Sequence, residues 1–83
     1  MYENLQNYLD GEIHEFKVAT FFMKEWSTLE GYQRYRDYTL QRIMGATFFA
    51  EHLGLDFEII DRMYGKAKAE IMATYEKGKG EFA

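Results

Sequence analysis

A short segment in the middle of the chain, residues 32–38, alternates tyrosine with arginine, and both residue types are well suited to binding. Tyrosine and arginine contribute much of the affinity at protein interfaces. They also bind single-stranded nucleic acid, by stacking on bases and contacting phosphates. A third interpretation is structural, with two tyrosines in the core and the arginines paired to Asp37 or Glu30. The candidate partner-binding residues of this segment are Tyr32, Arg34, Tyr35, Arg36 and Tyr38.

Basic residues near the end of the chain form a second candidate surface. Arg62, Lys66 and Lys77 fall on one face of the predicted last helix, and Lys79 follows in the expected tail. These four residues could extend a basic surface. They could equally favour the negative end of the helix dipole, which attracts cations.

Acidic residues and histidines occur close together twice, as Glu12, His14 and Glu15 and again as Glu51 and His52. Metal ligands on a helix are usually one turn apart, as in the Glu-x-x-His motif. Neither group has that spacing. We therefore expect solvated polar faces at both places, with no metal site and no cofactor.

The residue types needed for catalysis are not arranged for it. The seven glycines are scattered rather than gathered in a phosphate-binding loop, and no cysteine is present to act as a nucleophile. The only serine, Ser27, is expected to cap a helix. Acids are plentiful, but none is flanked in a way that indicates a pocket with a shifted pKa. We expect a protein that is not an enzyme and assign no catalytic residue.

A long central helix must position the tyrosines and arginines. Residues 27–30, Ser-Thr-Leu-Glu, match the capping-box pattern, in which Ser27 caps the helix and Glu30 reaches back to the Ser27 amide. Apolar residues then recur every three or four positions to about Leu53, which predicts one helix. The apolar stripe is wide, because Met44, Phe48 and Phe49 extend it, and this width indicates burial on more than one side.

The turn that follows is short. Gly54 is placed to end the helix in a left-handed conformation, and Asp56 is placed to cap the next helix, which is predicted from about Phe57 to Lys77. Because only Gly54 and Leu55 separate the two helices, we expect them to meet at a steep angle with Leu55 between them.

This corner resembles a helix-turn-helix motif. The positions that carry the resemblance are the small, turn and apolar positions Phe49, Ala50, Leu53, Gly54, Leu55, Ile60 and Met63. In that family the start of the second helix reads DNA. Here Asp56, Glu58 and Asp61 would face phosphates, which is electrostatically costly. Phe57 and Ile59 are instead expected to be apolar anchors or dimer contacts.

The fold class expected from these elements is all-α, a compact bundle of three to four helices with a helix-turn-helix-like corner at residues 54–56. The apolar positions of the first 26 residues keep one phase across Gly11. Either one helix runs through Gly11 or two helices share a face there, and we expect a break. Residues 1–80 are predicted to form a single domain, followed by a short tail at residues 81–83.

Composition indicates contacts with other molecules. Aromatic residues make up 18% of the 83 residues and apolar residues 47%, more than three or four short helices can easily bury, so we expect a homodimer, a higher oligomer or a heteromeric contact. Residues 31–47 carry three arginines and one acid, a charge of +2, whereas residues 48–61 carry four acids, a charge of −4. Charge of alternating sign suits complementary docking.

We expect an intracellular, cytoplasmic protein with no membrane contact, because no signal peptide and no apolar run of membrane-spanning length is visible. Our functional hypothesis is a small, non-enzymatic regulatory protein that acts by binding another protein. Its composition is typical of regulators and inhibitors from phage or other mobile elements. The alternative is a dimeric helix-turn-helix protein that binds DNA, and a purely structural subunit is a third class.

Overall fold

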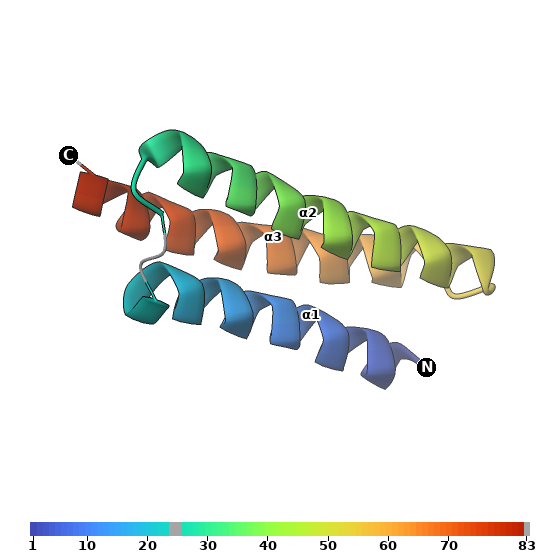
Figure 1. Cartoon of the computed structure of the whole chain (residues 1–83). Helices are drawn as coiled ribbons and strands as arrows, with labels where there is room; N and C mark the ends of the chain where they lie inside the picture. Colours follow the sequence, from blue (N-terminus) through green and yellow to red (C-terminus); the bar gives the residue numbers. More distant parts are fainter. Residues whose placement is uncertain (24–25, 83) are drawn as a thin grey trace.

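Three long helices make up most of the chain in the computed structural model, which describes residues 1–23 and 26–82 (Figure 1). No strand occurs in these two ranges, so the predicted all-α class is confirmed, with three helices. The elements are α1 (Tyr2–Val18), a π-helical turn η1 (Ala19–Met23), α2 (Leu29–His52), α3 (Phe57–Lys79) and a 3₁₀ turn η2 (Gly80–Phe82).

The axes of all three helices are roughly aligned with one another (Figure 1). Helices α2 and α3 lie side by side, and their chains run in opposite directions. The 24 residues of α2 span about 36 Å at 1.5 Å per residue. The Cα trace measures only 18 × 16 Å across its two shorter axes, so a helix of this length fits only along the 43 Å axis. The predicted steep angle is therefore wrong, and the helix-turn-helix-like corner is not confirmed. Antiparallel alignment buries the apolar stripes of both helices along their length.

The tight turn itself is formed as the sequence predicts. Gly54 has a φ of +93°, in the region that favours glycine. The Asp56 carboxylate accepts hydrogen bonds from the amides of Glu58, at 2.8 Å, and Ile59, at 3.3 Å, and so caps α3. The Asp56 amide donates to the hydroxyl of Tyr2, at 2.7 Å. This bond fixes the start of α1 at the turn end of the α2–α3 hairpin.

Helix α2 begins one residue later than predicted. Thr28, not Ser27, is the N-cap, and its hydroxyl accepts a hydrogen bond from the Gly31 amide at 3.1 Å. With Thr28 in this role, the third helical position is Gly31, which has no side chain to reach back. The capping box predicted between Ser27 and Glu30 is therefore wrong.

Helix α1 runs through Gly11 without interruption, so the predicted break is wrong. A glycine inside a helix costs about 1 kcal/mol relative to alanine. Leu9 and Phe16 are completely buried in the bundle and Ile13 is nearly so, and they lie on both sides of Gly11 in one phase. Burial of these three side chains outweighs the cost at Gly11, which lies on the exposed side of the helix.

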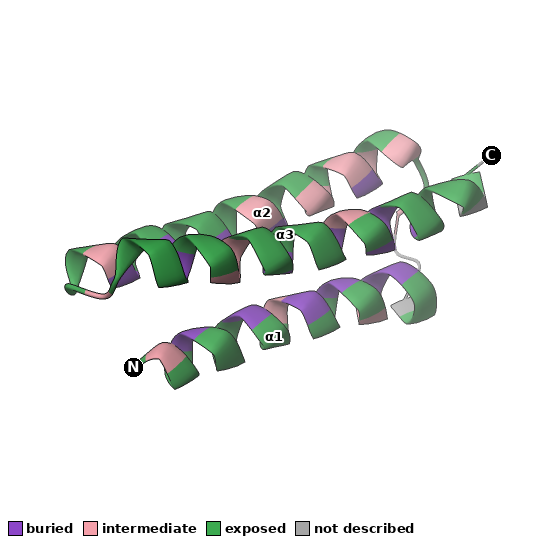
Figure 2. Ribbon diagram, turned by 180° about the vertical axis from the view of Figure 1, so that it is seen from behind, coloured by how far each residue is buried: buried purple, intermediate pink, exposed green. Residues whose placement is uncertain are grey.

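Helix α3 continues to Lys79 rather than ending near Lys77, so Lys79 lies in the helix and not in a tail. The buried residues lie along the sides of the helices that face one another (Figure 2), and Ile43, Ile60 and Ile71 are among the most completely buried. Within the described ranges, no helix combines the length and the apolar character needed to cross a membrane.

Candidate protein interface

Tyr32, the first predicted binding residue, belongs to the core. It is only 2% exposed. Its hydroxyl shares a hydrogen bond with the Thr20 hydroxyl at 3.0 Å and donates to the Thr74 carbonyl at 3.4 Å. Its ring stacks on those of Phe16 and Tyr75, at centroid distances of 5.7 and 5.0 Å. Tyr32 therefore cannot contact a partner, and the structural interpretation holds at this position.

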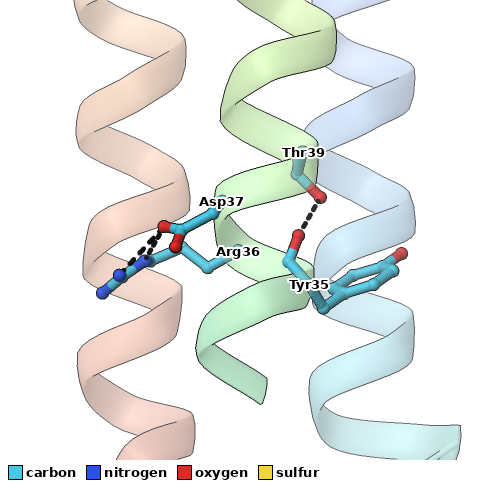
Figure 3. A network of polar contacts seen from close by, with 4 residues as sticks. All are labelled: Tyr35, Arg36, Asp37 and Thr39. Atoms are coloured by element: carbon cyan, nitrogen blue, oxygen red, sulfur yellow. Dashed lines mark hydrogen bonds and ion pairs between the residues drawn. The ribbon is translucent and has the colours of Figure 1, made fainter. Parts of the chain in front are cut away.

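Tyr35 is half-buried between α1 and α2. Its ring stacks on Phe16 at 5.5 Å and meets the edge of Trp26 at 4.7 Å. Figure 3 shows its side chain directed towards α1. Burial raises the pKa of the Tyr35 hydroxyl, and the negative charge of Glu15 raises it further. Only part of this side chain remains available for binding.

Arg36 lies on the other side of α2, towards α3 (Figure 3). Its Nε and Nη2 atoms donate to the Asp37 carboxylate at 3.0 and 2.9 Å. The guanidinium also lies over the ring of Tyr75, 4.4 Å from the centroid, which is a cation–π contact. Arg36 thus joins α2 to α3, and it is not a free binding group.

Arg34 and Tyr38 are the two predicted binding residues of this segment that face outward. Both are exposed, Tyr38 by 60%, and Arg34 makes no hydrogen bond or ion pair with any residue in the described ranges. They border a hollow of about 440 Å³ beside Trp26 and Tyr35. The indole Nε1 of Trp26 is buried without a hydrogen-bond acceptor among the described residues. We call this place the Arg34–Tyr38 site; its remaining lining residues are Ser27, Thr28 and Gly31.

Phe57 and Ile59 are exposed, by 63% and 38%, but at the opposite end of the bundle. Tyr38 and His52, at the end of α2, are separated by 14 residues, or about 21 Å of helix. The seven residues predicted to bind a partner therefore do not form one surface. Tyr32, Tyr35 and Arg36 hold helices together, Arg34 and Tyr38 border one hollow, and Phe57 and Ile59 lie near the turn.

An apolar surface on the second half of α2 was missed by the sequence analysis. Met44, Phe48, Phe49 and His52 surround Gly45 and enclose a shallow hollow of about 550 Å³ together with Gln41. Phe48 is 59% and Phe49 65% exposed, so the prediction that these rings are buried is wrong. We call these six residues the α2 patch. Met44 and Phe48 also line a groove that reaches Phe57 on α3.

The spacing along α2 contains a signal for this patch. Gln41, Gly45, Phe48 and His52 are four, three and four residues apart, which defines one side of a helix. The buried residues Thr39, Ile43, Thr47 and Ala50 follow the same spacing on the opposite side. The wide apolar stripe that the sequence analysis assigned to this helix is therefore two stripes on opposite sides of α2, one facing the core and one facing outward.

The four predicted basic-surface residues are exposed but are not gathered together. Arg62 and Lys66 lie 11 residues or more before Lys77, about 16 Å along α3, and Glu70 lies between and pairs with Lys17 at 3.6 Å. Lys79 pairs with Glu76 at 3.0 Å, and this hydrogen bond raises the pKa of Lys79. These residues do not form a continuous basic face.

A polar network links α1 to α2. Arg42 donates from Nε to Glu12 at 3.0 Å and from Nη2 to the Thr39 hydroxyl at 3.3 Å. Burial lowers the pKa of the Arg42 guanidinium, but the hydrogen bond and charge of Glu12 outweigh this and raise it. The pKa of Tyr8 is raised by burial and then by Glu12. No cluster of three or more metal-ligating side chains occurs among the residues described.

Comparison with protein-family models, with curated proteins and with solved structures finds no match to this chain. The function must therefore be argued from the surfaces of the chain itself.

Proposed function

We propose that this protein is a non-enzymatic binding protein that acts by docking onto another protein through the Arg34–Tyr38 site. The observation that carries the proposal is the combination of a free cation and a free aromatic ring at one hollow. Arg34 has no partner among the described residues, and Tyr38 is 60% exposed beside it. Arginine and tyrosine are the residue types that concentrate binding energy.

The lining of the hollow indicates what it would bind. Arg34 offers a planar set of donors that suits a carboxylate. Tyr38 adds an apolar ring. The fitting partner is a protein segment that carries an acidic residue next to an apolar one.

A regulator or inhibitor is the role we propose for such a chain, because a small protein can act by covering the surface to which it binds. The DNA-binding alternative has no comparable support. Asp56, Glu58 and Asp61 are all exposed at the start of α3, where a recognition helix would meet phosphates. A salt-dependent shift of duplex DNA in a gel would favour that alternative.

Photo-crosslinking tests the proposal. A photoreactive phenylalanine analogue placed at position 38 is expected to yield a covalent adduct with one other protein in an extract of the source organism. The same analogue at Phe22, which is 81% exposed outside the hollow, serves as the matched control and should not capture that protein. Equal capture from positions 22 and 38 would contradict the proposal.

A further inference from the structure

We propose that the α2 patch is the interface between two copies of this chain, paired antiparallel through their α2 helices. This interface is separate from the Arg34–Tyr38 site. The hollow of the patch can receive a side chain from a second copy. Gly45 contributes no side chain to this hollow, and the exposed rings of Phe48 and Phe49 lie beside it and leave a notch there. A ring from a second copy can fill the notch of the first.

The register follows from this fit. A two-fold axis level with Thr47 brings Phe49 of one copy opposite Gly45 of the other, and Gln41 opposite Leu53. The same residues then contact each other twice, as an isologous dimer requires. Because α2 ends at His52, the second copy covers residues 41–53 and its turn reaches about as far as Tyr38. Arg34 and the hollow beside Trp26 stay open, one at each end of the dimer.

Charge favours the antiparallel direction. Glu51, Asp56, Glu58 and Asp61 give residues 48–61 a charge of −4, and residues 31–47 carry +2. Parallel pairing would bring both acidic ends together. Antiparallel pairing places the two acidic ends at opposite ends of the dimer, and avoiding contact between like charges favours this orientation over the parallel one.

The exposed apolar area is on the scale that a dimer needs. An aromatic side chain offers about 150–250 Å², so the exposed fractions of Phe48 and Phe49 (59% and 65%) amount to roughly 250 Å². A specific interface buries about 800 Å² per partner, and these two rings supply nearly a third of it. The chain also exposes 5627 Å², about 400 Å² more than the surface typical of a 9.9 kDa monomer.

Sedimentation equilibrium of the full chain tests the dimer. The expected mass is that of two 9.9 kDa chains, and Phe48→Glu is expected to raise the dimer dissociation constant by roughly 30-fold or more. Phe22→Glu, which changes an exposed phenylalanine outside the patch, should leave the constant unchanged. Circular dichroism confirms that each variant is folded. A monomer at every concentration, or equal effects of both substitutions, would overturn the proposal.

Disulfide trapping tests the direction, since the chain contains no cysteine of its own. Antiparallel pairing predicts that a mixture of Gln41→Cys and Leu53→Cys chains forms a mixed disulfide, whereas Gln41→Cys alone does not crosslink. Rapid crosslinking of Gln41→Cys with itself would show parallel pairing and overturn the proposed arrangement. Neither result bears on Arg34 or on the hollow beside Trp26, because both lie outside the paired stretch.

Discussion

Gly78 of α3 lies directly against the phenol of Tyr32 of α2. A Cβ at position 78 would be 2.9 Å from Cζ of Tyr32 and closer still to its hydroxyl oxygen. No larger residue fits there while the Tyr32 hydroxyl keeps its bonds to Thr20 and Thr74. The lack of a side chain at Gly78 thus leaves the space that the buried Tyr32 phenol occupies.

Gly78→Ala should destabilise the protein for this reason. Alanine improves helix propensity, but the clash with the Tyr32 ring and with Thr20 makes overpacking dominate, at about 1–3 kcal/mol. Gly65→Ala, in the same helix with nothing within 4 Å of the new Cβ, is the matched control and should stabilise by about 0.5–1 kcal/mol. Urea unfolding of both variants measures the difference. Equal stabilisation by the two substitutions would refute the packing at Gly78.

The turn between α2 and α3 makes a second prediction. Gly54→Ala should lower the free energy of unfolding by about 1–2 kcal/mol, because a side chain at φ +93° is strained. Gly11→Ala, in the exposed middle of α1, should raise it. Thermal unfolding followed by circular dichroism compares the two variants. An unchanged melting temperature for Gly54→Ala would mean that the turn does not have this conformation.

Alkaline stability should depend on Tyr35. Burial raises its pKa in the folded state above the ordinary tyrosine value of about 10. The contribution of the Tyr35 hydroxyl to the free energy of unfolding is therefore complete below about pH 10. It is lost as the pH rises through the raised pKa of the folded state. Tyr35→Phe should lose less stability than the wild type as the pH rises above about 10. Parallel pH profiles in urea unfolding would show that Tyr35 does not cause the loss.

The Arg42–Glu12 pair should couple α1 to α2. The Glu12 side chain is only 11% exposed and that of Arg42 43%, so salt screens the pair incompletely. A double-mutant cycle with Glu12→Gln and Arg42→Gln should give a coupling energy of about 0.5–1 kcal/mol. A cycle between Lys17 and Glu70, whose side chains are 48% and 58% exposed, should give less. Equal coupling in the two cycles would mean that the burial of Glu12 has no effect.

The all-α class, the Gly54 turn and the Asp56 cap were predictable because each depends on local sequence: helical periodicity, a glycine and a capping carboxylate. The angle between α2 and α3 was not predictable from local sequence, because it is set by the packing of the apolar stripes of both helices against each other. The same limit applies to the site. Arg34 and Arg36 look equivalent in sequence, but in the structure Arg36 bonds to Asp37 and lies over Tyr75 of α3, whereas Arg34 makes neither contact. Phe48 and Phe49 were assigned to the core because apolar spacing does not reveal which side of a helix faces solvent.

The most direct test of the proposed function is the affinity of this chain for the protein captured from position 38. The double variant Arg34→Ala/Tyr38→Ala should bind it roughly 30-fold more weakly than the wild type, as expected for removal of hot-spot residues. Lys68→Ala, an exposed change elsewhere on α3, should bind with the wild-type dissociation constant. Isothermal titration calorimetry measures all three. A folded double variant that retains the wild-type dissociation constant would contradict the claim that this protein acts through the Arg34–Tyr38 site.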